Sequence, residues 1–320
     1  MNILLDPAIL FFIFGVLAGF VKSNLEIPPA ISRFLSLYLL MALGLKGGFA
    51  LHESGFTTEI ALSLLAAVFL AILIPIIAYT ILKNKLKPLD AAAIAATYGS
   101  ISAVTFITTT QILDFSGISY GGHMAAAMAL MESPAIIFAI IIANNIRSKN
   151  LSTAKSKHAS LSKILHESFT DGGQLLLIGA MLIGLISGEV AQKAMGPFSI
   201  DLFKGLLAFF LLDMGLLAAR NISGLRKQPM IVIIYAVIAP LFHAFIALFI
   251  AQLIGLELGN TVLLMVLAAS ASYIAVPAVL KDAMPEVSPA LYMGTSLGVT
   301  FPLNIIVGIP LYIYIAQHFV

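Results

Sequence analysis

The 320-residue sequence contains no cysteine, and charged residues make up only 10% of it. Without cysteine, the chain can form no disulfide and offers neither a thiol nucleophile nor a thiolate ligand to a metal. A soluble domain would carry charge on roughly a quarter of its residues. No Walker A loop, HExxH or GxSxG sequence occurs, so nothing indicates ATP-driven work or hydrolysis. We therefore expect neither an enzyme nor a bound cofactor or nucleic acid, and any energy must come from an ion gradient unless movement is passive.

Hydrophobic residues are abundant, at 60% of the chain. They form recurring apolar runs of about 20 residues, the length that crosses a bilayer as a helix. The runs are continuous and not alternating, which predicts an all-α polytopic membrane protein surrounded by lipid. The first run has no basic region before it, so we expect a short span and not a cleaved signal peptide. The ten predicted spans are residues 8–22, 30–50, 59–82, 90–112, 121–146, 170–191, 200–219, 229–253, 260–280 and 289–317.

The two halves of the sequence look like copies of each other. Several glycines, prolines and one short motif recur at offsets between 168 and 172 residues. The matched positions are Gly15 and Gly184, Gly19 and Gly188, Pro28 and Pro197, Gly44 and Gly215, SISAV (100–104) and SYIAV (272–276), and Pro134 and Pro302. The pattern predicts a first repeat over residues 1–146, a linker over 147–168 and a second repeat over 169–320. Because each repeat has five spans, the second enters the membrane from the opposite side, which makes the repeats inverted.

Basic residues cluster in the loops that follow the odd-numbered spans. These loops hold 14 of the 17 basic residues, namely Lys22, Arg33, Lys83, Lys85, Lys87, Arg147, Lys149, Lys155, Lys157, Lys163, Arg220, Arg226, Lys227 and Lys281. Positively charged loops stay in the cytoplasm. We therefore predict a multi-pass protein of a bacterial cytoplasmic (inner) membrane, with both termini outside. The cytoplasmic linker is interpreted either as an orientation signal or as a loop that docks a partner.

Spans 4 and 9 carry unusual polar or helix-breaking residues. The fourth contains ATYGSISAVTFITTTQ (96–111), and the ninth contains SASYIAVP (270–277), which ends in a proline. We expect Pro277 to break or kink its helix, because proline lacks an amide hydrogen and clashes with the preceding turn. Paired interruptions in inverted repeats indicate a transporter site near the bilayer midplane. The alternative is that the hydroxyls only bond within their own helix or join helices, which we favour for Thr108, Thr109 and Thr110.

Ionisable residues also lie within predicted spans. Buried charge in a membrane is costly and is usually functional. Glu132 precedes Pro134 in span 5 and is a candidate to bind a cation or to line a cavity. Asp213 and Lys46 occupy corresponding regions of the two halves, so we expect them to pair. His243 fits a hydrogen-bonded packing residue better than a proton carrier.

Four stretches of the sequence together resemble the SbtA-type sodium-dependent bicarbonate transporters, first known from cyanobacteria. They are ALMESPAIIFAIIIANN (129–145), APLFHAFIALFIAQLIG (239–255), LLMVLAASASYIAVPAVLKDAMP (263–285) and SPALYMGTSLGVTFPLNIIVGIPLYIYIAQ (288–317). The resemblance covers nearly the whole chain. It implies crossed broken helices, a core domain that moves against a scaffold domain, a homotrimer and Na⁺ symport of bicarbonate. It also implies a small PII-like regulator on the cytoplasmic side.

The chain departs from this family at the two interruptions. Ser-Gly-Ser-Thr of the family corresponds to Ser102, Ala103, Val104 and Thr105 here. Ser-Ser-Ser-Asp corresponds to Ser270, Ala271, Ser272 and Tyr273, and an aspartate of span 5 corresponds to Glu132. The linker is also shorter than in cyanobacterial members.

From these matches we predict an anion site and a Na⁺ site at the crossing. The anion is expected at Ser102, Ala103, Val104, Thr105, Ser272, Tyr273, Ile274 and Ala275. Oxygens of Ser100, Ser270 and Glu132 are the candidates to bind Na⁺, the one metal ion that we expect. Alternative functions are a related sodium and organic-anion symporter, a cation/proton antiporter, or a transporter-like membrane sensor that binds an anion. Tyr273 argues against the antiporter, which needs a titrating carboxylate at the crossing.

Overall fold

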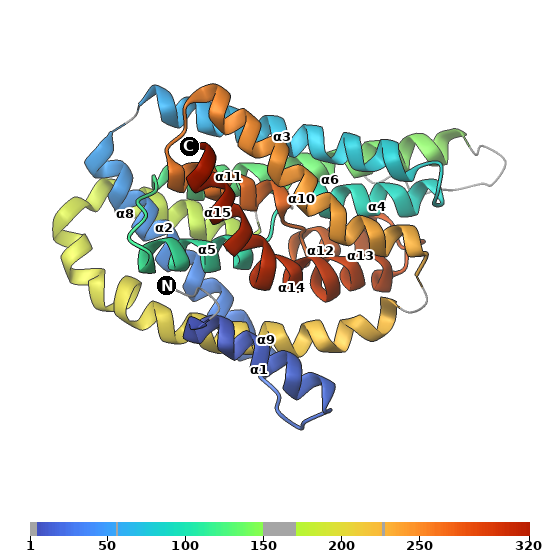
Figure 1. Cartoon of the computed structure of the whole chain (residues 1–320), viewed down its shortest axis with the longest axis horizontal. Coiled ribbons are helices and arrows are strands. Elements are labelled where there is room, and N and C mark those ends of the chain that lie inside the picture. The colour runs from blue at the N-terminus through green and yellow to red at the C-terminus, as the bar shows by residue number, and fades with distance from the viewer. Residues whose placement is uncertain (1–4, 56, 150–170, 226–227) are drawn as a thin grey trace.

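The computed structural model describes residues 5–55, 57–149, 171–225 and 228–320, and all regular structure within these ranges is helical (Figure 1). Seven helical stretches in these ranges are long and apolar enough to cross a membrane. Two shorter helices, Pro7–Phe20 and Leu258–Ala269, are also apolar. The predicted linker lies almost entirely outside the described residues, so its role stays a prediction.

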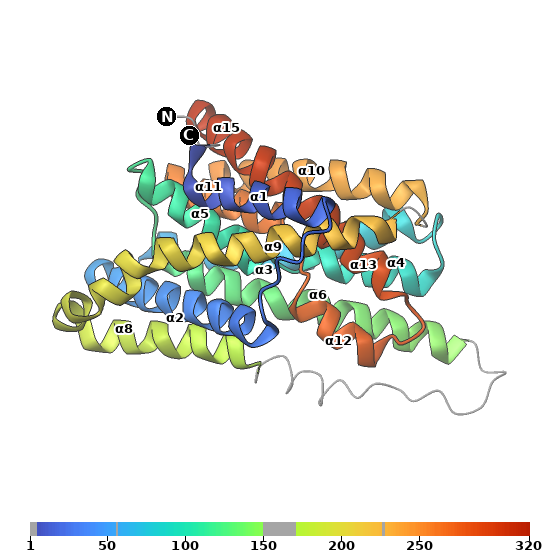
Figure 2. The same cartoon turned by 90° about the horizontal axis from the view of Figure 1, so that it is seen from below.

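One group of helices is built from two closely packed pairs, and we call it the paired-helix group. Helix α1 (Pro7–Phe20) runs along α9 (Leu202–Leu225), and α2 (Pro29–Ser54) runs along α8 (Gly172–Gly196) (Figures 1 and 2). A short π-helical turn, η2 (Pro197–Asp201), joins α8 to α9. Each pair therefore combines one helix from each half of the sequence.

Glycines set how closely these pairs approach. A Cβ atom added to Gly15 of α1 would lie 2.2 Å from the carbonyl oxygen of Leu212 and 3.2 Å from Cα of Gly215 on α9. A Cβ atom on Gly48 of α2 would lie 2.1 Å from the carbonyl oxygen of Met181 on α8. Small residues at such contacts allow two backbones to approach within membranes, where packing replaces the hydrophobic driving force. The glycines that mark the repeat in the sequence are thus the residues on which the paired helices meet.

The remaining helices form a second group, which we call the interrupted-helix group. It comprises α3 (Thr58–Leu82), α4 (Pro88–Gly99), α5 (Ala103–Phe115), α6 (His123–Lys149), α10 (Met230–Ile254), α11 (Leu258–Ala269), α12 (Ala275–Ala283), α13 (Pro289–Thr295), η3 (Ser296–Thr300), α14 (Phe301–Leu303), η4 (Asn304–Gly308) and α15 (Ile309–Phe319). Most of its packing is internal, with α3 against α4 and α6, and α10 against α11. In the view of Figure 1, α1 and α9 lie along the lower edge of this group and α2 and α8 lie at its left.

Spans 4 and 9 of the sequence are each divided into two helices. Residues 100–102 separate α4 from α5, and residues 270–274 separate α11 from α12. All of α4 from Ala91 to Gly99 and all of α11 from Gly259 to Ala269 are buried. Non-helical backbone at membrane depth survives only when it is buried in protein or lines a cavity, and this burial meets that requirement.

Pro277 does not cause the second interruption in the way that the sequence predicts. It is the third residue of α12, so it lies within the first turn of that helix. There its missing amide hydrogen removes no intrahelical bond, because first-turn amides have no partner within the helix. The helix ends several residues earlier, at Ala269, and the proline is compatible with the first turn of the next helix, α12.

Candidate functional site

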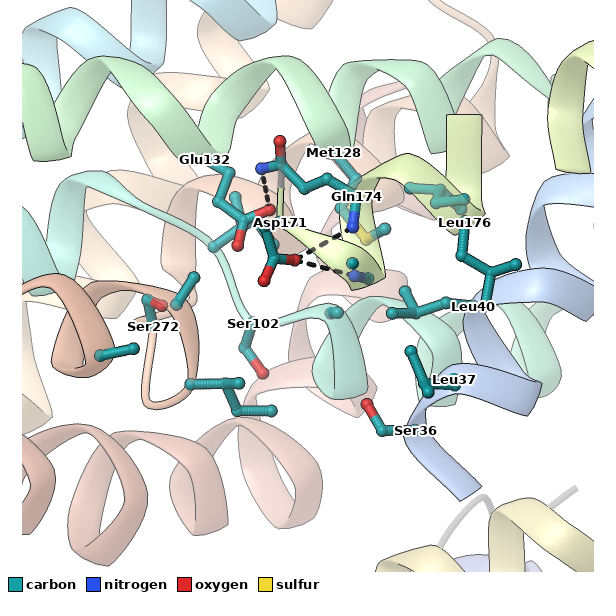
Figure 3. A pocket seen from close by; sticks show the side chains of 18 of the residues that line it. Ser36, Leu37, Leu40, Ser102, Met128, Glu132, Asp171, Gln174, Leu176 and Ser272 are labelled. Carbon is teal, nitrogen blue, oxygen red and sulfur yellow. Dashed lines mark hydrogen bonds between the residues drawn. The ribbon is translucent and has the colours of Figure 1, made fainter. Parts of the chain in front are cut away.

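A cavity of about 590 Å³ lies where the two interruptions meet the paired-helix group (Figure 3). Ser102 and Ser272 face it from the two interruptions, with Glu132, Asp171 and Gln174 above them in the view (Figure 3). The side chains that line it come from α2, α6, α8, α12 and both interruptions. They include Arg33, Ser36, Ile101, Ser102, Ala103, Met128, Glu132, Asp171, Gln174, Ser272, Tyr273, Ile274, Ala275, Ala278 and Val279.

Two hydrogen bonds join the interruptions to each other. The amide of Ser272 donates to the carbonyl oxygen of Thr97 at 2.8 Å. The amide of Ser102 donates to Oγ of Ser270 at 3.0 Å. The second interruption thus bonds to the last turn of α4 and the first interruption bonds to Ser270, so each extended segment satisfies part of its exposed backbone on the other half of the crossing.

The amino-terminal ends of α5 and α12 point their free amides toward this crossing. Oγ of Ser102 caps α5 by accepting from the Thr105 amide at 3.2 Å, and it also accepts from Oγ1 of Thr105 at 2.8 Å. Oγ of Ser272 accepts from the amide of Val276 at 3.2 Å. Within the described chain, the amides of Ala103 and Val104 have no hydrogen-bond partner. A helix amino terminus with free amides is an electropositive end suited to an anion.

The carboxyl-terminal ends of α4 and α11 meet at the same crossing. Oγ of Ser100 is buried and has no hydrogen-bond partner among the described residues. Oγ of Ser270 donates to the Leu267 carbonyl at 2.9 Å and accepts from Ser102. Carbonyl oxygens at broken helix ends are typical ligands of Na⁺ in transporters. Neither serine lines the cavity, so this potential cation site lies behind its wall.

The predicted site residues divide between the cavity surface and its support. Of the eight anion-site candidates, six line the cavity, while Val104 and Thr105 are buried behind Ser102 and Ala103. Glu132 lines the cavity from α6, where its carboxylate accepts a hydrogen bond from Nε2 of Gln174 on α8. The structure thus places Glu132 in the cavity wall and the other two Na⁺ candidates behind it.

The predicted pairing of Lys46 with Asp213 is wrong. Nζ of Lys46 on α2 lies 2.6 Å from Oδ2 of Asp114 at the end of α5. Asp213 is buried on α9 with Ser32 and Arg220 as its polar neighbours, and one of its oxygens has no hydrogen-bond partner among the described residues. Ser32 and Lys46 are 14 residues apart on one helix, or about 21 Å at 1.5 Å per residue. Corresponding positions in the repeats therefore face different partners.

His243 is buried on α10 and lies outside the cavity. Its ring packs against Tyr235 with centroids 6.3 Å apart. Neither ring nitrogen has a hydrogen-bond partner by geometry among the described residues, so the expected hydrogen bond is not seen.

Four polar residues of the cavity were not predicted as site residues from the sequence. Arg33 and Ser36 lie in the first turns of α2, and Asp171 and Gln174 lie at the start of α8. The Asp171 carboxylate caps α8 by accepting from the amides of Gly173 and Gln174, at 2.9 and 3.1 Å. An acidic residue followed by two glycines before an apolar run is a detectable helix-start signal, but it does not reveal what the end of the helix faces.

Comparison with known proteins gives one result for nearly the whole chain. A family model described as the Na⁺-dependent bicarbonate transporter superfamily matches residues 7–317. No curated protein matches the sequence.

Proposed function

The chain belongs to the Na⁺-dependent bicarbonate transporter superfamily, and from this we propose that it carries bicarbonate together with Na⁺ across a bacterial cytoplasmic membrane. The observation that carries the proposal is the crossing of two interrupted helices at a cavity, joined by the Ser272–Thr97 and Ser102–Ser270 hydrogen bonds. No motif for ATP hydrolysis occurs in the sequence, so the Na⁺ gradient supplies the energy.

Bicarbonate binds, in this proposal, at the amino-terminal ends of α5 and α12. The free amides of Ala103 and Val104, the amide of Ala275 at the start of α12, and the hydroxyls of Ser102 and Ser272 are all neutral donors. Neutral donors aligned with a helix dipole suit a monovalent oxyanion, because they stabilise one negative charge and bring no competing counter-ion.

Na⁺ binds at the carboxyl-terminal ends of α4 and α11. Ser100 contributes a buried hydroxyl that has no partner in the described ranges, and Ser270 lies at the matching position of the second interruption. Glu132 adds negative charge from the cavity wall. The carbonyl ends of α4 and α11 thus favour the cation, and the amide ends of α5 and α12 favour the anion, at one crossing, which couples the two ions electrostatically.

The helix pairs support inverted repeats. Helix α1 packs on α9 and α2 packs on α8, so the first and second spans of one half contact the second and first spans of the other. A two-fold axis in the membrane plane that exchanges the halves would map one pair onto the other. We propose ten spans in this arrangement, with both termini outside, and a homotrimer with a PII-like cytoplasmic regulator.

The cavity opens toward the predicted cytoplasmic side. Its lining includes Arg33, in the first turns of α2, and Asp171, directly before α8; both helix starts adjoin loops that the positive-inside rule places in the cytoplasm. Lys46 and Asp114 form their ion pair toward the other end of α5, between the two helix groups. We interpret this as the inward-open state of an alternating-access, elevator-type cycle in which the interrupted-helix group moves along the paired-helix group.

The direct test is labelled-bicarbonate uptake into proteoliposomes, with and without an inward Na⁺ gradient. We expect Ser102→Ala and Ser272→Ala each to lower uptake at least tenfold, because each change removes a donor to the anion and a helix cap worth about 1 kcal/mol. Thr110→Val is the matched control, since its buried hydroxyl donates to the carbonyl of Ile107 within the same helix and does not line the cavity. Uptake that is independent of Na⁺, or that survives both serine changes, would contradict the proposal.

A second candidate is transport of a larger organic anion. The cavity volume of about 590 Å³ falls within the range of roughly 300–1,000 Å³ that is typical of drug-sized ligands. Competition by small organic carboxylates in the same uptake assay separates the two, because a bicarbonate carrier should be inhibited weakly or not at all.

A further inference from the structure

Tyr273 occupies a position in the second interruption that the proposed anion site does not yet explain. It lines the cavity together with Ser102 and Ala103, yet only 5% of the residue is exposed. Its ring packs edge-on against Phe301, with centroids 5.1 Å apart and an angle of 61° between the planes. This contact holds the side chain in one direction, so the position of its hydroxyl is set by packing.

By distance and angle, the Tyr273 hydroxyl makes no hydrogen bond among the described residues, although the side chain of Ser102 lies near it. Buried hydroxyls in folded proteins are nearly always hydrogen-bonded to protein, water or ligand. The hydroxyl itself is covered, but Tyr273 and the neighbouring Ser102 both line the cavity, so an anion that enters between these two side chains can supply the missing partner.

The side chain of Ser102 is a polar neighbour of that hydroxyl. Oγ of Ser102 already accepts two hydrogen bonds, from the amide and the hydroxyl of Thr105. A serine hydroxyl has two acceptor positions and one hydrogen, so Ser102 retains its hydrogen as a donor. Ser102 and Tyr273 therefore present two hydroxyl donors from different interruptions, next to the free amides at the start of α5.

We infer that Tyr273 is a specificity-determining residue whose phenol O–H binds an oxygen of the transported anion at the amino terminus of α5. The inference rests on the proposed function and deepens it, because it assigns a hydrogen-bond donor where the related cyanobacterial transporters carry a carboxylate. A phenol donates to an oxyanion and adds no negative charge, whereas a carboxylate there would attract a cation and repel the anion. The residue thus acts on the anion and not on Na⁺.

The test compares Tyr273→Phe with Tyr235→Phe in proteoliposomes. Phenylalanine keeps the ring contact with Phe301 and removes only the hydroxyl. Tyr235 is the matched control, because its hydroxyl is also buried without a partner in the described chain but does not line the cavity. Initial rates of labelled-bicarbonate uptake are measured against bicarbonate at saturating Na⁺, and then against Na⁺ at saturating bicarbonate.

For Tyr273→Phe we expect the KM for bicarbonate to rise about tenfold, the effect of one ordinary hydrogen bond. The half-saturating Na⁺ concentration should not change, and Tyr235→Phe should match the wild type in both. An unchanged KM in Tyr273→Phe would show that the hydroxyl meets only water. A change confined to Na⁺ would show that it ligates the cation, and either result overturns the inference.

Failure of the proposed function gives a different result. If the wild type takes up no bicarbonate, the same two proteins are heated in detergent with bicarbonate, formate, nitrate, acetate or sulfate. An anion that raises the Tm of the wild type but not of Tyr273→Phe supports the phenol donor for another oxyanion. An equal rise in both proteins, or no rise with any of the five anions, overturns it.

Discussion

At the scale of single residues, Glu132 has two roles that substitutions can separate. Its carboxylate is a negative charge in the cavity wall and also the acceptor of a bond from Gln174 on the other helix group. Glu132→Gln keeps the size of the side chain and removes the charge. We expect the half-saturating Na⁺ concentration to rise about tenfold and the KM for bicarbonate at saturating Na⁺ to stay the same, because lost attraction of a partly desolvated charge is worth about 1–2 kcal/mol. Uptake kinetics measure both.

Two further variants decide between charge and contact at this position. Gln174→Ala removes the contact and leaves the charge, so it should change the Na⁺ dependence much less than Glu132→Gln. Glu189→Gln removes an exposed carboxylate of α8 outside this cavity and should leave transport unchanged. Equal effects of Glu132→Gln and Gln174→Ala would mean that Glu132 acts by holding α6 to α8.

The location of a residue follows from the sequence where the local chain defines it, whereas the predicted anion-binding roles stay predictions. Ser102 and Ser272 were expected at the crossing because each lies in a polar interruption, and both line the cavity. Asp114 was missed as the partner of Lys46, since it lies just beyond the predicted end of span 4. Partner choice depends on how α2 is placed along α5 and α9, and that placement is set by long-range packing that no local pattern contains.

At the scale of helices, the close approach of α2 and α8 makes a prediction about stability. Gly48→Ala places a methyl group 2.1 Å from the Met181 carbonyl oxygen, so the two backbones must separate. Overpacking of this kind costs about 1–3 kcal/mol. We expect a clearly lower thermal unfolding midpoint for the detergent-solubilised protein.

Gly179→Ala provides the control within the same helix pair. A Cβ atom at Gly179 of α8 meets no atom within 4 Å, and alanine favours the helix over glycine by up to about 1 kcal/mol. Its midpoint should equal or exceed that of the wild type. If the two variants unfolded alike, the close backbone contact would not be what holds the pair.

The positions of helices α2 and α3 were predicted well from the sequence. The position of the interruption in span 9 was not. The hydrophobic segments predicted at 30–50 and 59–82 lie within α2 and α3. The interruption of span 9 was expected at Pro277, whereas the chain leaves the helix after Ala269. The break is held by bonds between Ser272 and Thr97 and between Asn304 and Ala269. Such bonds join segments that are far apart in the chain, and no local sequence pattern reveals them. The proline is the only local helix-breaking signal in this stretch, so a prediction from the sequence places the break there.

At the scale of the whole molecule, the two helix groups contact each other less than the helices within each group do, and polar bonds are among the contacts between the groups. The paired-helix and interrupted-helix groups each pack mostly within themselves. Polar bonds between them include Lys46 with Asp114, both partly exposed, and Gln174 with Glu132, both in the cavity wall. A boundary with a few exchangeable polar contacts is what a sliding movement needs, since each contact can be replaced by water.

A covalent bond across this boundary tests whether the groups must move. A Cβ atom on Gly47 of α2 would lie 3.4 Å from Cβ of Ala125 on α6, close to the separation of about 3.5–4.5 Å found in disulfides. Because the chain has no cysteine, the double variant Gly47→Cys/Ala125→Cys contains one possible pair. We expect oxidation to abolish bicarbonate uptake and a reductant to restore it, since the bond fixes one group against the other.

Each single variant controls for the crowding that the new side chain causes, because a Cβ on Gly47 also approaches the Gly122 carbonyl oxygen to 2.9 Å. Both should respond to neither oxidant nor reductant. Cross-linking is checked by the mass of a fragment pair after proteolysis. A fully cross-linked protein that still transports at the wild-type rate would exclude sliding of α2 past α6 and would confine any movement to within the interrupted-helix group.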